Sequence, residues 1–139
     1  MKKLIIITLV AMVFGCSPED ATPTAPVDDM FDPTGATLLK AGTFMGTPGH
    51  PVSGVAKIYD DKGKHIVQFE NFSSVNGPDL KVYISKDANA TTFINLGPLK
   101  STVGMQSYDI TGMPDYSEYK FVLIWCKEFS VLFGSAEVE

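Results

Sequence analysis

The chain has 139 residues, with 16 acidic residues against 11 lysines and no arginine, so its formal net charge is −5. Nucleic acids and anionic lipid headgroups are bound by basic patches, so this charge balance argues against nucleic acid as a partner and against electrostatic docking on lipid. The length suits one domain with a real hydrophobic core.

Residues 1–15 have the layout of a bacterial lipoprotein signal peptide. Two lysines precede the apolar run 4–14, which is too short to span a bilayer of ~30 Å. Gly15 stands just before Cys16, as in a lipobox. We expect residues 1–15 to be removed and Cys16 to carry acyl chains such as palmitate, which attach the protein to a membrane of the cell envelope, facing outside the cytoplasm. The alternative is an ordinary cleaved signal with an incidental cysteine.

Residues 16–37 are predicted to be an acidic, proline-rich tether. From residue 17 to residue 35 the segment carries four prolines and five acidic residues and no basic residue. Such a composition does not offset the entropy of ordering, and proline and like charges keep a chain extended. We therefore expect the tether to hold the domain away from the membrane.

Residues 38–139 are predicted to form one all-β domain, an antiparallel β-sandwich of about eight strands. Alternating or continuous apolar runs bounded by glycine, proline and aspartate are typical of strands and turns. The expected strands are 43–45, 52–60, 65–72, 80–85, 92–95, 106–110, 119–126, 129–134 and 136–138.

The segment 119–126, "YKFVLIWC", is apolar on both faces of the expected strand, which favours a central strand covered on both sides. It ends at Cys126, the only cysteine of the domain, so a disulfide within the domain is excluded. A free cysteine commonly packs as a small hydrophobe. Cys126 instead stands where the apolar run gives way to Lys127, whose ammonium group would favour the thiolate if it lay near the sulfur.

Several familiar redox and metal sites are excluded by spacing. The chain has no Cys-x-x-Cys and no Cys-x-x-Cys-His motif. A structural zinc site lacks ligands, and a blue-copper centre would need histidines placed around Cys126. No metal site is predicted, although a non-standard copper site from His50, His65, Met45 and Met105 stays open.

The order of several motifs over residues 42–138 resembles the DM-thirteen electron-transfer domain. The motifs that carry the resemblance are "GPDLKVY", "LGPLKSTVGMQSY" and "WC" followed by "FSVLFG". The resemblance implies a small β-rich extracellular domain that transfers electrons to or from a redox partner protein. It also implies that Cys126 is a bare redox thiol or a ligand to a prosthetic group such as haem.

Two functions from different classes are therefore expected. The first is a lipid-anchored electron-transfer domain in which Cys126 is functional and lies close to the surface at the end of a rigid strand. The second is a non-catalytic, lipid-anchored binding or structural β-sandwich in which Cys126 is core packing. Whether the domain is an enzyme stays open.

Overall fold

The computed structural model describes residues 21–139, which form nine β-strands and no helix. The predicted signal peptide 1–15 and Cys16, the predicted site of lipidation, lie outside the described residues. The strands are β1 (Val27–Asp28), β2 (Thr37–Gly46), β3 (Val52–Asp61), β4 (Lys64–Ser74), β5 (Leu80–Ser85), β6 (Phe93–Pro98), β7 (Gly104–Ile110), β8 (Phe121–Cys126) and β9 (Val131–Glu137).

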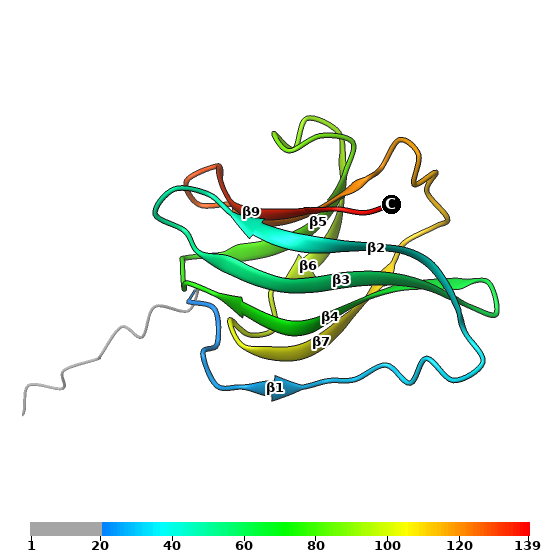
Figure 1. Cartoon of the computed structure of the whole chain (residues 1–139). Coiled ribbons are helices and arrows are strands. Elements are labelled where there is room, and N and C mark those ends of the chain that lie inside the picture. The colour runs from blue at the N-terminus through cyan, green and yellow to red at the C-terminus, as the bar shows by residue number, and fades with distance from the viewer. Residues whose placement is uncertain (1–20) are drawn as a thin grey trace, which may run out of the picture.

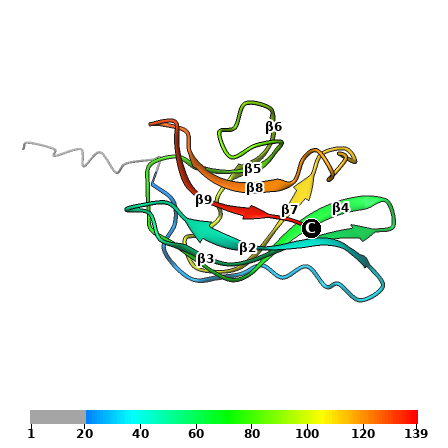
Figure 2. The same ribbon diagram turned by 45° about the horizontal axis from the view of Figure 1, so that its top comes forward.

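All nine strands belong to one curled sheet with the order β1-β7-β4-β3-β2-β9-β8-β5-β6. Neighbouring strands are antiparallel except β1, which runs parallel to β7. Figures 1 and 2 show that the sheet curls so that β2, β3, β4 and β7 face β5, β8 and β9. The predicted all-β class is confirmed, and the two facing layers are halves of a continuous sheet.

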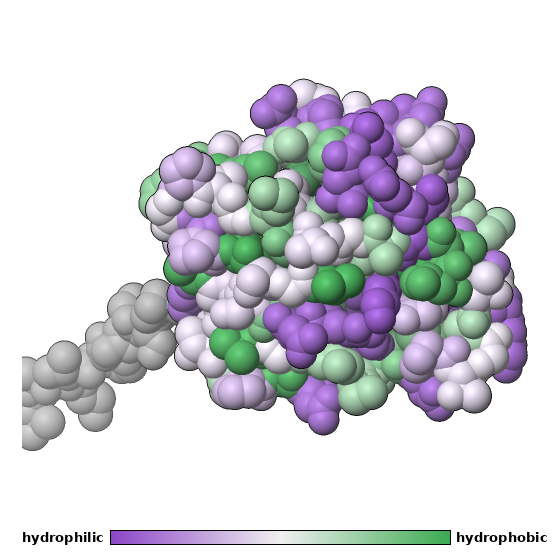
Figure 3. Space-filling model, viewed as in Figure 1, coloured by the Kyte–Doolittle hydropathy of each residue, from purple (hydrophilic) through white to green (hydrophobic). Residues whose placement is uncertain are grey.

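The core fills the space between the two facing halves of the sheet. Buried side chains from β2, β3, β4 and β7 meet side chains from β5, β8 and β9, as alternation along each strand requires. Phe44, Phe69 and Phe72 form a cluster with ring centroids 4.9–5.3 Å apart. On the outer side, Figure 3 shows hydrophilic residues gathered over β3 and β4, where Lys57 and Glu70 form an ion pair of 2.8 Å.

Strand β8 lies between β5 and β9, and the central position predicted for this segment is confirmed. Val122, Leu123 and Ile124 are fully buried, so both faces of the strand are covered. The strand starts at Phe121, two residues later than predicted.

Most other predicted strands are found with shifted ends. The larger differences concern β9, β2 and β1. The segments 129–134 and 136–138 form the single strand β9, and β2 extends from Thr37 rather than from residue 43. The short strand β1 was not predicted, because two residues carry no periodic pattern.

Residues 21–37, the described part of the predicted tether, lie against the domain instead of extending away from it (Figure 1). The backbone of Val27 donates to the carbonyl of Val103 over 3.0 Å, and Thr102 donates to the carbonyl of Pro23 over 2.9 Å. The expectation that the whole tether is extended is therefore wrong. The composition of the segment did not reveal that the edge of β7 has unpaired backbone groups, which an added strand satisfies.

Gly104 allows this close approach. Its φ of 111° lies in a region that other residues rarely adopt, and a Cβ at this position would collide with the carbonyl oxygen of Val27. No helix within residues 21–139 is long and apolar enough to cross a membrane.

Candidate functional site

Cys126 is the last residue of β8, between Leu80 of β5 and Val131 of β9. Its predicted position at the end of a strand is confirmed. The side chain is 0% exposed and belongs to the hydrophobic core, so the expectation that it lies close to the surface is wrong. The cause is a loop from a distant part of the chain that folds over the end of the strand.

This cover is the loop 75–79, "VNGPD", which connects β4 to β5. The thiol of Cys126 donates a hydrogen bond to the carbonyl oxygen of Pro78, with an Sγ–O distance of 3.1 Å. The backbone N–H of Lys127 donates to the carbonyl of Asp79 over 3.1 Å, which fastens the loop to the end of β8. The loop therefore covers the thiol through a few polar contacts rather than through a strand of the sheet.

Gly77 fits this loop against the core. A Cβ at residue 77 would lie 2.6 Å from Cζ of the Phe133 ring, closer than real side-chain contacts allow. Any larger residue must therefore displace the loop or the ring, and the loop is the less constrained of the two because Phe133 belongs to the core of β9.

An apolar hollow of about 430 Å³ lies beside the cover. Its volume is in the range of small-molecule sites. The imidazole of His50 stacks on Phe133 with ring centroids 4.1 Å apart and donates to or accepts from the hydroxyl of Thr47 over 3.2 Å. Phe129, at the tip of the β8–β9 hairpin, lies at the edge of the hollow and is 68% exposed. The lining residues are Gly49, His50, Val75, Asn76, Gly77, Pro78, Phe129, Val131 and Phe133.

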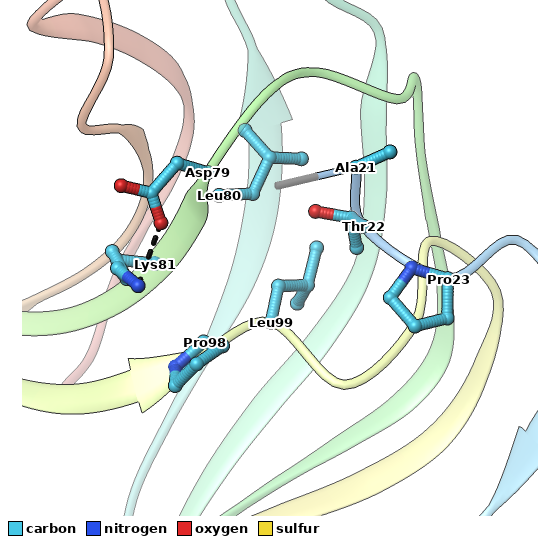
Figure 4. A pocket seen from close by; sticks show the side chains of 8 residues that line it. All are labelled: Ala21, Thr22, Pro23, Asp79, Leu80, Lys81, Pro98 and Leu99. Atoms are coloured by element: carbon cyan, nitrogen blue, oxygen red, sulfur yellow. Dashed lines mark ion pairs between the residues drawn. The ribbon is translucent and has the colours of Figure 1, made fainter. Parts of the chain in front are cut away.

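A second hollow, of about 330 Å³, lies between the start of the described chain and the start of β5, as Figure 4 shows. The carboxylate of Asp79 pairs with the ammonium group of Lys81 over 2.6 Å at its rim. Ala21 forms an antiparallel bridge with Pro78, the residue whose carbonyl accepts the hydrogen bond of Cys126. The N-terminal segment thus meets the cover of the thiol directly.

The electrostatic role expected of Lys127 has no support in the geometry. Its side chain is exposed, and the contact that Lys127 makes with the cover runs through its backbone N–H. Within residues 21–139, the ion pairs and hydrogen bonds do not include one between the Lys127 ammonium group and the thiol.

The surroundings of Cys126 do not fit a haem ligated by this residue. A thiolate ligand has lost its proton and faces an apolar cavity that holds the macrocycle. Here the protonated thiol donates a hydrogen bond to the carbonyl of Pro78, and the lining of the neighbouring hollow does not include Cys126.

The two histidines lie at opposite ends of β3, so the non-standard copper site is not assembled. His50 precedes the strand and His65 follows it, and the ten residues between the ends of β3 span roughly 33 Å. Nδ1 of His65 lies 2.8 Å from the hydroxyl of Tyr116, and burial raises the pKa of that tyrosine to about 12.

Sequence reasoning identified the thiol and its place on a strand, but it missed the groups around it. The motif "GPDLKVY" includes part of the loop 75–79, but the sequence did not connect this loop, Phe129 or the stacked pair of His50 and Phe133 with Cys126. No local pattern could make this connection, because these residues come from three separate connections of the sheet and from strand β9.

Comparison with known proteins agrees with the resemblance found in the sequence. A family model described as Electron transfer DM13 matches residues 43–138. The searches of curated proteins and of solved structures return no match. The matched range contains β3 to β9, Cys126 and the loop that covers it, and the chain belongs to the electron transfer DM13 family.

Proposed function

We propose that the protein is a lipid-anchored electron-transfer domain of the bacterial cell envelope in which Cys126 is the redox thiol. The proposal rests on the family and on one observation: the domain's only thiol ends a rigid strand beneath a cover of loop residues. Because a loop with few polar contacts opens at a lower free energy than a sheet does, the thiol is protected at rest and becomes reachable on local opening.

Thiol–disulfide exchange is the chemistry that fits one cysteine. With the loop open, the thiolate of Cys126 attacks a disulfide of a partner protein, a new S–S bond forms, and the partner's S–S bond breaks. The departing partner sulfur takes up a proton. The domain has no second cysteine to resolve the mixed disulfide, so a thiol of a partner resolves it, and two electrons pass in each full exchange.

The membrane anchor is the second element of the proposal. A lipid on Cys16 is supported by the positively charged start, the short apolar run and the small residue before the cysteine. Cys16→Ala should block maturation or release the protein from the membrane fraction, measured by detergent partitioning of cell extracts. Unchanged partitioning of this variant would contradict the anchor.

Complete burial of the sulfur favours a second candidate, a lipid-anchored binding or structural domain in which Cys126 is core packing. The two candidates differ in how the thiol becomes reachable. A redox thiol is exposed by local opening of the loop, whereas a packing thiol is exposed only when the whole domain unfolds.

Thiol labelling under native conditions separates these candidates. The rate of reaction of Cys126 with a disulfide reagent gives the free energy of opening, which is compared with the free energy of global unfolding from urea titration. We expect labelling at least about tenfold faster than global unfolding permits, equal to a gap of ~1.4 kcal/mol. Equal free energies of opening and unfolding would establish the packing role and refute the redox thiol.

Two glycine variants test whether the loop 75–79 controls access to Cys126. Gly77→Ala should speed the labelling of Cys126, because its Cβ would collide with Phe133 and displace the loop. Gly112→Ala is the matched control, since it lies in the connection between β7 and β8 at the opposite end of the domain, with a φ of 75° and open space around its Cα. The control should lower global stability without changing the free energy of local opening at the loop.

A further inference from the structure

The chain enters the domain at the end that carries Cys126. Ala21, the first described residue, bridges to Pro78, and Figure 4 shows it beside the start of β5. Since residues 21–37 lie along the domain, only the four residues 17–20 separate Cys16 from Ala21, which is five steps along the chain. At no more than about 3.6 Å for each residue, this length reaches roughly 18 Å.

This reach is short compared with the domain itself. A strand of ten residues such as β3 is roughly 33 Å long. An acyl group on Cys16 would therefore keep Ala21, and with it one end of the sheet, within a short distance of the lipid surface. We call this end the near end, defined by the connections 47–51, 75–79, 99–103 and 127–130.

The near end exposes apolar side chains without a basic patch. Phe129 is 68% exposed at the tip of its hairpin, Met45 is 73% exposed where β2 ends, and Val103 is 37% exposed in the connection before β7. The connection 47–51 has no charged side chain, and the exposed Lys127 and Glu128 that precede Phe129 carry opposite charges. On the face in Figure 3, hydrophilic residues gather most densely at the upper right, away from the side where the described chain begins in Figure 1.

We propose that the near end is a membrane-contact surface, with the tip of the β8–β9 hairpin seated in the lipid interface through Phe129. The inference rests on the proposed lipid at Cys16. Burial of an aromatic ring at the interface is favourable, and the acyl chains supply the attachment that a single ring could not. Because the surface has no basic patch, the contact does not depend on anionic lipid.

This orientation bears on the thiol. The loop 75–79 and the apolar hollow beside Cys126 both belong to the near end. A partner that exchanges with Cys126 therefore approaches along the membrane surface.

Depth-dependent quenching of tryptophan tests the orientation in the full lipidated protein. Trp125 is replaced by phenylalanine, and a single tryptophan is placed at the near end by Phe129→Trp or at the opposite end by Met113→Trp. Met113 is the matched control because it is 70% exposed in the connection between β7 and β8. The proteins are bound to phosphatidylcholine vesicles in which part of the lipid carries brominated acyl chains.

We expect the tryptophan at position 129 to lose emission to brominated lipid, and the tryptophan at position 113 to keep it. If Trp125→Phe does not fold, the same comparison is made with Trp125 retained, as a difference from the wild-type protein. Vesicle flotation distinguishes the two proposals. Protein that floats while position 129 stays unquenched overturns the orientation alone, and protein that does not float overturns the lipid anchor and the orientation with it.

Discussion

Replacing Cys126 by serine tests how completely the sulfur is buried away from solvent. The side chain is fully buried, and its thiol donates to the carbonyl of Pro78 over 3.1 Å. A hydroxyl group in the same place is more polar than a thiol. It also lies further from the carbonyl, because a C–O bond is shorter than a C–S bond.

The expected loss of stability follows from two opposing effects. Burying a hydroxyl group without a partner costs about 1–3 kcal/mol, and a net hydrogen bond returns about 0.5–1.5 kcal/mol. Since the bond to Pro78 is stretched in the variant, we expect Cys126→Ser to lower the free energy of unfolding by about 1–2 kcal/mol.

Urea unfolding followed by the fluorescence of Trp125 measures this change, because Trp125 adjoins the substituted residue and is the only tryptophan of the chain. The slope of the unfolding free energy against urea concentration should stay the same, so that only the midpoint of the transition moves. Lys127→Gln is the control, and since Lys127 is an exposed turn residue it should change stability by no more than about 0.5 kcal/mol. A Cys126→Ser protein as stable as wild type would show that the sulfur is not sealed beneath the loop.

Three further predictions concern the fold. Ile124→Asp should unfold the domain, seen by circular dichroism, because an isolated charge in the centre of β8 costs several kcal/mol; a native-like melting curve would contradict the position of this strand. Gly104→Ala should release the N-terminal segment to proteolysis because its Cβ would collide with a carbonyl oxygen of β1, whereas Gly97→Ala, with open space around it, should not; equal cleavage would refute the packing of this segment. Above pH 10 the free energy of unfolding should fall, because burial raises the pKa of Tyr116 to about 12 and raises the pKa of Tyr108 further. These phenols keep their protons in the folded chain, whereas the unfolded chain loses them. Phenolate absorbance that shows both tyrosines ionising near pH 10 in the native protein would contradict this prediction.

The sequence by itself determined the class of fold, the central strand and the family. Alternation of apolar and polar residues is a local signal, and it placed β5 at its observed bounds and β3 and β4 to within two residues. The run 119–126, apolar on both faces, predicted a strand covered on both sides, and the strand is found at 121–126, because a strand that is buried on both faces needs apolar side chains at successive positions.

Only the tertiary structure decided how Cys126 is covered and where the chain from Cys16 joins the domain. The carbonyl that accepts the hydrogen bond of the thiol belongs to Pro78, 48 positions earlier in the chain, and no local pattern encodes a contact of that separation. The packing of residues 21–37 was hidden for a related reason. Composition describes what a segment can bury by itself, whereas this segment is held mainly by backbone hydrogen bonds to the open edge of β7, which exists only after the sheet has formed.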